Sequence, residues 1–419
     1  MRYLSLLALL GLIVSTAILP TVIVHATPSQ TSVKSIQTIP PVKTKEELEA
    51  RITAGSTSLD AFTPFGRREF LASIRWGSKG ISSFSTSPIR RELSVKEAIA
   101  IFQFVGMAEL AASYAKDRAQ QPSLRLAEPT PQMEKLFLAF EEWRDSLPVS
   151  SEEAIEKKQA LTKQDNTRYL QYIQENLSDL LTEPALRNLS DTDLFLTFQI
   201  ISNIASLTLE QSIIHQQRSL YQKLQERHID TRRSIDKQIL SVFIDLREFD
   251  QAREFITKHP HLNREKIPRV IDHLPKHFSG RSVFRYEPKN NTLHRQELKL
   301  TDGRQLVMVV GAGCHFSREA LTAISKDRDL FEKLKNANLL ITTAPSESAP
   351  LFFLETWNKN HASMPVLVPG QREEWREIDL PAVPMFHFFE DGKLTKTIAG
   401  WNGQTTIDQL RDFINKKVD

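Results

Sequence analysis

The sequence predicts an α plus α/β protein, in which an all-α helical domain is followed by a carboxy-terminal domain with a βαβ-ββα order of elements. From residue 94 to residue 259, apolar residues recur at helical spacing and no β-type alternation is present. From Leu306 onwards, short continuous apolar runs alternate with amphipathic stretches, which is typical of buried parallel strands joined by helices.

The chain is long enough for two or more domains, because its 419 residues exceed what one hydrophobic core usually organises. We expect a signal peptide over 1–26, a flexible leader and arm over 27–91, a helical domain over 92–260, a linker over 261–297 and the α/β domain over 298–419. The formal net charge of +3 is close to neutral and gives no indication of a nucleic-acid partner.

The first 26 residues have the composition of a secretory signal. Arg2 precedes an apolar run from Leu4 to Leu19, and Val24-His25-Ala26 fits the small-x-small rule for cleavage. This predicts a mature protein in the periplasm of a bacterial envelope or secreted from the cell. An uncleaved membrane anchor over residues 4–24 remains an alternative. No later stretch approaches the length of a transmembrane helix, so we expect no membrane span after signal removal.

Residues 27–91 are rich in Ser, Thr and Pro, with short apolar islands between them. This composition predicts a flexible leader, poorly ordered over residues 27–60, followed by a partly ordered arm that packs on another part of the protein.

The helical domain begins at a capping box formed by Ser94 and Glu97. Further helices are expected over residues 132–147, 152–181, 191–227, 234–246 and 250–258. The pattern from Leu246 to Phe255 resembles one tetratricopeptide-type hairpin, in which Ala252 lets two helices approach closely. Because repeat proteins need about three repeats, we expect a helical hairpin rather than a peptide-binding solenoid. The prolines and glycine that follow, up to residue 291, predict the linker.

The α/β domain starts with a buried strand, Leu306 to Val310, which ends in Gly311-Ala-Gly313 before Cys314-His-Phe-Ser317 and a helix. A second strand is expected over 339–343, a helix over 351–360, an extended segment over 365–368, a hairpin over 383–399 and a last helix over 405–416.

The single cysteine is the candidate reactive group. Because the chain has one cysteine, Cys314 cannot form an internal disulfide and is either inert or available for pairing with another molecule. Its position in the first turn of a helix exposes it to backbone N–H groups and a dipole that stabilise a thiolate. His315 is either a thiolate partner or an ordinary exposed helix residue, and Ser317 either hydrogen-bonds the sulfur or is inert.

The order of these elements resembles the thioredoxin superfamily, with Cys314-His-Phe-Ser317 at its CxxC position and Val383-Pro384 at its cis-proline loop. The resemblance implies a cis Val383–Pro384 bond that lies against the Cys314 turn, where a client strand pairs with the backbone of Val383. Ser317 stands where the second cysteine would be, and Gly313 replaces the usual Trp. The motif is therefore similar to those of monothiol members of the disulfide-isomerase and glutaredoxin groups.

These features predict an exported monothiol protein that engages thiols or disulfides of envelope client proteins through Cys314, while the helical domain selects or holds the client. No cofactor is expected, and whether the protein is an oxidoreductase or isomerase stays open. The alternative is a catalytically inert thioredoxin-fold module for binding or assembly. A peroxide-reducing enzyme would need a resolving partner and a Thr or Arg setting that the sequence does not offer.

The histidines of the linker do not predict a metal site. His259, His261, His273 and His277 lie in a proline-rich segment without the carboxylate spacing of a metal centre, so we expect solvated linker histidines. His387 lies in the final hairpin and is expected to face solvent.

Overall fold

The structure is a computed structural model, and its described elements all belong to one compact unit that spans Pro40–Asp419. The described residues are 42–55, 57–77, 80–107, 111, 124–146, 158–232, 234–262, 266–300, 303–345, 349–378 and 383–415. The predicted signal peptide and the leader up to residue 41 lie outside these residues.

The amino-terminal part is a small helical layer with a two-stranded hairpin. Its elements are α1 (Lys45–Thr53), η1 (Ser58–Ala61), α2 (Pro64–Ala72), β1 (Arg75–Gly77), β2 (Gly80–Ser83), α3 (Ser87–Glu92) and α4 (Val95–Phe104). Leu59, Phe70 and Ile89 are fully buried in a common core cluster. The prediction of a poorly ordered leader up to residue 60 is therefore wrong from residue 42 onwards, because the apolar islands pack against one another. The arm that follows is packed, as predicted.

A longer series of helices follows. It comprises α6 (Pro131–Ser146), α8 (Lys158–Asn176), α9 (Glu183–Asn188), α10 (Asp191–Thr208), α11 (Gln211–Glu226), α12 (Ile235–Asp245), α13 (Phe249–Lys258) and η2 (Pro260–Leu262). Within the described residues from 124 to 262 there is no strand, as predicted. The expected single helical range 191–227 is two helices, because Leu209 adopts a left-handed conformation (φ 53°) and ends α10.

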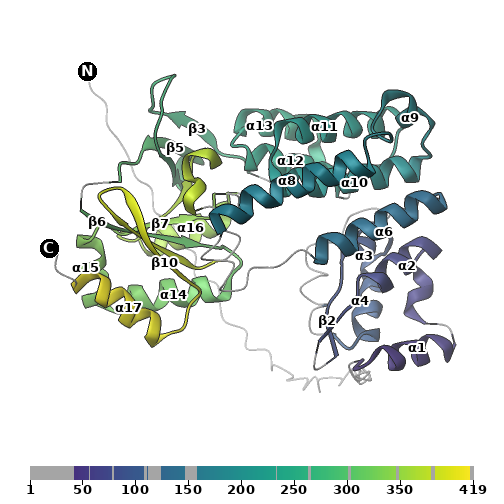
Figure 1. The fold of residues 1–419 in the computed structure, drawn as a ribbon, viewed down its shortest axis with the longest axis horizontal. Coiled ribbons are helices and arrows are strands. Elements are labelled where there is room, and N and C mark those ends of the chain that lie inside the picture. The colour runs from purple at the N-terminus through teal and green to yellow at the C-terminus, as the bar shows by residue number, and fades with distance from the viewer. Residues whose placement is uncertain are drawn as a thin grey trace, which may run out of the picture. The chain divides into compact units, whose positions relative to one another are not determined.

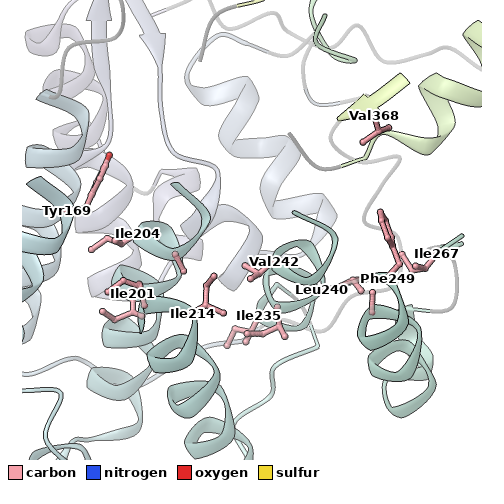
Figure 2. Packing of buried hydrophobic residues seen from close by; sticks show 14 of the residues in the cluster. Tyr169, Ile201, Ile204, Ile214, Ile235, Leu240, Val242, Phe249, Ile267 and Val368 are labelled. Atoms are coloured by element: carbon pink, nitrogen blue, oxygen red, sulfur yellow. The ribbon is translucent and has the colours of Figure 1, made fainter. Parts of the chain in front are cut away.

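Figure 2 shows how three of these helices share one core: Ile201 and Ile204 of α10 lie near Ile214 of α11, and Ile235 and Val242 of α12 follow in the same layer. The pair α12 and α13 forms the expected helical hairpin, in which Ala252 is fully buried.

The carboxy-terminal part is built on an eight-stranded mixed sheet with the order β10-β9-β6-β7-β8-β4-β5-β3. The strands are β3 (Arg269–Asp272), β4 (Ser282–Glu287), β5 (Thr292–Glu297), β6 (Arg304–Val310), β7 (Leu340–Thr343), β8 (Val366–Pro369), β9 (Met385–Glu390) and β10 (Lys393–Ala399). The helical elements are η3 (Pro288–Asn290), α14 (His315–Lys326), α15 (Arg328–Asn336), α16 (Leu351–Asn360), η4 (Arg372–Ile378) and α17 (Gln404–Asn415).

One half of the sheet has the predicted βαβ-ββα order (Figure 1). Strand β6 runs parallel to β7, β9 runs antiparallel to β6, and β10 pairs antiparallel with β9. The two faces of β6 are both buried. Leu306 and Met308 belong to the core cluster shared with α14, α15 and α17, whereas Val307 and Val309 pack in a second cluster with Trp375 of η4.

The expected linker is instead part of the sheet. Residues 261–297 contain β3, β4 and β5, and β4 pairs with β8 through Val283 opposite Pro369 and Phe284 opposite Val368. The prolines and glycine that suggested a loop lie between the strands, at turns such as η3. Val283 and Phe284 of β4 are buried, so this segment belongs to the hydrophobic core and does not merely connect two domains.

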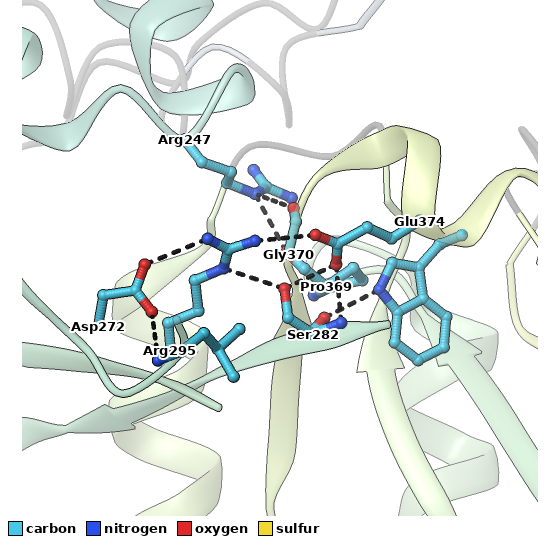
Figure 3. A network of polar contacts seen from close by, with 9 residues as sticks. Arg247, Asp272, Ser282, Arg295, Pro369, Gly370 and Glu374 are labelled. Atoms are coloured by element: carbon cyan, nitrogen blue, oxygen red, sulfur yellow. Dashed lines mark hydrogen bonds and ion pairs between the residues drawn. The ribbon is translucent and has the colours of Figure 1, made fainter. Parts of the chain in front are cut away.

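A polar network holds the turn between α12 and α13 to this sheet (Figure 3). The guanidinium of Arg247 donates to the carbonyls of Pro369, Gly370 and Pro345 over 3.1–3.3 Å. Close by, Glu374 accepts hydrogen bonds from the amide and hydroxyl of Ser282, and a Cβ at Gly370 would lie 2.0 Å from Ser282 Oγ. Position 370 therefore has no space for a side chain.

Candidate thiol site

The site begins where β6 ends. Gly311 follows the buried strand, and its carbonyl accepts a hydrogen bond from the backbone amide of Cys314 (3.1 Å), which closes the turn. Cys314 is the N-cap residue of α14 and is half-buried, and its carbonyl accepts from the amide of Arg318. The sulfur thus lies at the amino-terminal end of a twelve-residue helix, as the sequence predicts.

The predicted partner of this turn is in place. The Val383–Pro384 peptide bond is cis, and Cys314 Sγ lies 3.4 Å from the carbonyl oxygen of Val383, to which the thiol donates. The carbonyl of Pro384 accepts from the amide of Gly400, so the start of β9 is also tied to the end of β10. Two segments that are 69 residues apart in the chain meet at the sulfur.

This close approach depends on a glycine. A Cβ at Gly311 would lie 2.6 Å from Val383 Cγ2, a distance that real side chains do not tolerate. At Gly313, by contrast, a Cβ would meet nothing within 4 Å. Sequence reasoning read both residues as turn formers and missed that the first one makes room for the Val383 loop.

Ser317 does not bond the sulfur. Its side chain is fully buried, and its Oγ accepts a hydrogen bond from the amide of Gly311 (3.1 Å). The structure gives Ser317 a role that the sequence analysis did not anticipate: it fixes the turn by connecting the first helical turn of α14 to the end of β6.

The imidazole of His315 pairs with Glu319 and not with Cys314. Its imidazole is exposed, with Nε2 3.0 Å from Glu319 Oε1 one helical turn later, and it contacts the ring of Phe316. Within the described part of the chain it makes no hydrogen bond to Cys314 Sγ. The structure therefore places His315 as an exposed helix residue beside the thiol.

Two exposed aromatic side chains occupy the same edge of the sheet. Phe316 is 54% exposed and Phe352, in the first turn of α16, is 82% exposed. Because β6 and β7 are parallel, the segments that follow them emerge at one edge, so these rings lie on the side of the sheet that carries Cys314. Sequence alone could not show that these two side chains are exposed.

The structure corrects the interpretation of one of the four histidines expected in the linker. His259 stacks on Phe255 and lies 2.9 Å from the Tyr221 hydroxyl, and His261 Nε2 lies 2.9 Å from a carboxylate oxygen of the buried Asp236. The ring of His273 stacks on His294, with 3.1 Å between their nitrogens. His259 is half-buried and packed, whereas His261, His273 and His277 are exposed as expected, although the first two also pair with Asp236 and His294.

His387 does not face solvent. It is fully buried on β9, its Nδ1 is 3.0 Å from Thr397 Oγ1, and its Nε2 is enclosed without a hydrogen-bond partner in the described structure. Burial lowers the pKa of His387 from 6.5 to about 3.

Two kinds of feature are absent from the described residues. No group of three or more His, Cys, Asp or Glu side chains among them has an arrangement that could hold a metal ion. No helix among them is both long and apolar enough to cross a membrane.

Comparison with known proteins adds little. No family model and no curated protein matches the chain. Among solved structures, the chain is similar to the crystal structure of a thioredoxin-like protein from Bacteroides caccae, with 14% identity, a TM-score of 0.23, and coverage of 70% of this chain and 96% of that one. The description of the fold therefore rests on the strand pairing of this chain itself.

Proposed function

We propose that this chain is an exported monothiol thioredoxin-like protein that forms mixed disulfides with client proteins of the bacterial envelope through Cys314. The contact between Cys314 Sγ and the carbonyl of Val383, beside a cis bond and at a helix start, carries the proposal. It supports thiol chemistry because Cys314 is the N-cap residue of α14, and the first backbone N–H groups of a helix have no partner within it. Export is proposed from the composition of residues 1–26.

The proposed step is a thiol–disulfide exchange. Cys314 loses its proton to solvent, and the thiolate attacks one sulfur of a client disulfide. A new S–S bond forms between Cys314 and that sulfur, while the second client sulfur leaves as a thiolate and takes up a proton. No net oxidant is needed, because one disulfide is exchanged for another.

The Val383 carbonyl also has a role in docking the client. In the resting protein it accepts the S–H proton of Cys314, and once the sulfur is bonded to a client it has no such donor. A backbone N–H of the client chain can then occupy that position, which is strand pairing at the loop. The exposed rings of Phe316 and Phe352 offer apolar contact to the same client segment.

Release must come from outside the chain. Cys314 is the one cysteine, and Ser317, at the resolving position, holds the turn through Gly311. The mixed disulfide therefore persists until a second client cysteine or a small thiol attacks it. This fits a protein that holds or isomerises its clients.

The test is to incubate the mature chain with a protein that carries scrambled disulfides, quench in acid and measure intact masses. We expect a covalent adduct with the native chain and none with Cys314→Ala. Ser317→Cys should shorten the adduct lifetime by about tenfold or more, because it supplies a thiol at high effective concentration. Ser317→Ala is the matched control, since it removes the same hydroxyl without adding sulfur.

The same experiment decides between this proposal and the catalytically inert binding module. If the native chain forms no adduct while Cys314 is fully alkylated by iodoacetamide, exchange is excluded and the fold serves as a binding surface.

A further inference from the structure

A buried ionic cluster lies among the amino-terminal helices, far along the chain from Cys314. Glu69 of α2 and Arg91 and Glu92 of α3 are 5%, 6% and 2% exposed. Arg91 Nη2 lies 2.6 Å from Glu69 Oε2 and 2.7 Å from Glu92 Oε1. With both carboxyl groups ionised, the cluster holds two negative charges against one positive charge, and an uncompensated buried charge is costly.

The two carboxylates differ in how completely they are bonded. Glu92 has a second donor, the amide of Thr63 at 2.8 Å, and Gly66 has no Cβ that would collide with its oxygens. Glu69 Oε2 accepts from Arg91, but Glu69 Oε1 has no hydrogen-bond partner among the described residues. The positive charge that the cluster lacks is therefore lacking next to Glu69.

Glu69 lines a cavity of about 450 Å³ between α2, the β1–β2 hairpin and α6. That volume is within the range of small-molecule sites. Hydroxyl groups of Ser73 and Ser85 lie on its wall, together with the apolar side chains of Phe84 and Leu138. The cavity thus combines an under-bonded carboxylate with an apolar surface.

Carboxylates outnumber cations on the wall of this cavity, with Glu69, Glu141 and Glu142 against Arg75 and Arg144. Arg144, on the wall, is held by Glu141 through two hydrogen bonds of 2.8 Å. Glu142 adds a further carboxylate to the wall, opposite in sign to an anionic ligand. Burial raises the pKa of Glu69, and a cation in the cavity would hold that carboxyl ionised.

We propose that this cavity binds a small organic amine, whose ammonium group pairs with Glu69 Oε1 and whose apolar body lies against Phe84 and Leu138. The ammonium supplies the positive charge that the cluster lacks and forms a charge-assisted hydrogen bond out of bulk water. This site is independent of the proposed thiol chemistry, because no residue of it belongs to the Cys314 region.

The experiment is isothermal titration of the mature chain with benzylamine and with benzyl alcohol, which has nearly the same shape but no charge. We expect benzylamine to bind at least about tenfold more tightly than benzyl alcohol. Glu69→Gln keeps the side-chain shape and removes the charge, so it should weaken benzylamine binding by about tenfold or more. Glu49→Gln, at an exposed position of α1 outside the cavity lining, is the matched control for general negative potential and should leave the affinity within about twofold.

Equal affinity for the two probes, unchanged affinity in Glu69→Gln, or no benzylamine binding at millimolar concentration would each overturn the proposal. If circular dichroism shows that Glu69→Gln is unfolded, Leu138→Trp replaces it, because a larger side chain fills the cavity. Loss of benzylamine binding in that variant supports the site, and retention of binding contradicts it.

Discussion

The surroundings of some single residues cannot be predicted from their neighbours in the sequence, and His387 is the clearest example. It lies between two phenylalanines in an alternating hairpin strand, which suggested an exposed position. The strand is instead covered on both faces, so the imidazole is buried and its pKa falls to about 3. Alternation indicates one exposed face only where the second face lacks a covering layer.

The burial of His387 predicts an acid-sensitive fold. Below pH 6.5 the unfolded chain binds a proton at this imidazole, whereas the folded chain does not until about pH 3. The free energy of unfolding should therefore fall as the pH drops from 6.5 towards 3, by at most about 1.4 kcal/mol per pH unit from this group. Denaturant unfolding at several pH values measures it.

The contribution of His387 to the pH dependence of the free energy of unfolding can be separated from that of other groups. His387→Leu should flatten the dependence between pH 6.5 and 4, whatever its effect on stability at neutral pH. The exposed His277→Gln is the control and should leave the slope as in the native chain. A slope unchanged by His387→Leu would show that another group is responsible.

Gly311 is a second residue with a specific role, because there is no room for a side chain between it and Val383. In Gly311→Ala, the new methyl group would force the Val383 loop away from the helix start, at a cost of about 1–3 kcal/mol. Because the contact between Cys314 Sγ and the Val383 carbonyl would open, alkylation of Cys314 by iodoacetamide should become faster.

Gly313→Ala provides the matched control for that prediction, since a Cβ there meets nothing within 4 Å. It should change the unfolding free energy by less than about 0.5 kcal/mol and leave the alkylation rate unaltered. Equal effects of the two substitutions would mean that Gly311 acts through backbone freedom rather than through space.

At the scale of elements, the side chain of Arg247 ties the turn between α12 and α13 to the sheet. Arg247 is buried and donates to carbonyl oxygens that follow β7 and end β8. Arg247→Met keeps the apolar stem but leaves these acceptors without a donor, and should cost about 3 kcal/mol of unfolding free energy.

The control for this prediction is Arg232→Met, whose guanidinium is largely exposed and pairs locally with Asp230. An exposed ion pair of this kind contributes little to the free energy of unfolding. Thermal or denaturant unfolding compares the two variants. A loss in Arg247→Met no larger than that in Arg232→Met would contradict the anchoring role.

For the whole molecule, the sequence was informative where its signals were local. The Ser94–Glu97 capping box, the hairpin over 383–399 and the placement of Cys314 at a helix start were all predicted and are present. The cis bond at Val383–Pro384 was implied by the resemblance and is present as well.

The predictions that were wrong concern residues whose contacts are distant in the chain. The strands within residues 261–297 were read as a linker because their prolines and glycine outweighed two short alternating runs, and β8, their partner, lies about eighty residues later. The break at Leu209 has neither Gly nor Pro to signal it. Burial of His387 and exposure of Phe352 depend on layers that no local pattern specifies.

The sheet ends at β10 on one side and at β3 on the other, and both end strands carry charged residues. Lys393 and Lys396 lie on β10, and Arg269 and Asp272 lie on the four-residue β3. A strand edge is a template for adding further strands from other molecules, and charges on a short or twisted edge oppose that growth. The sheet is thus protected at both ends against polymerising with copies of itself.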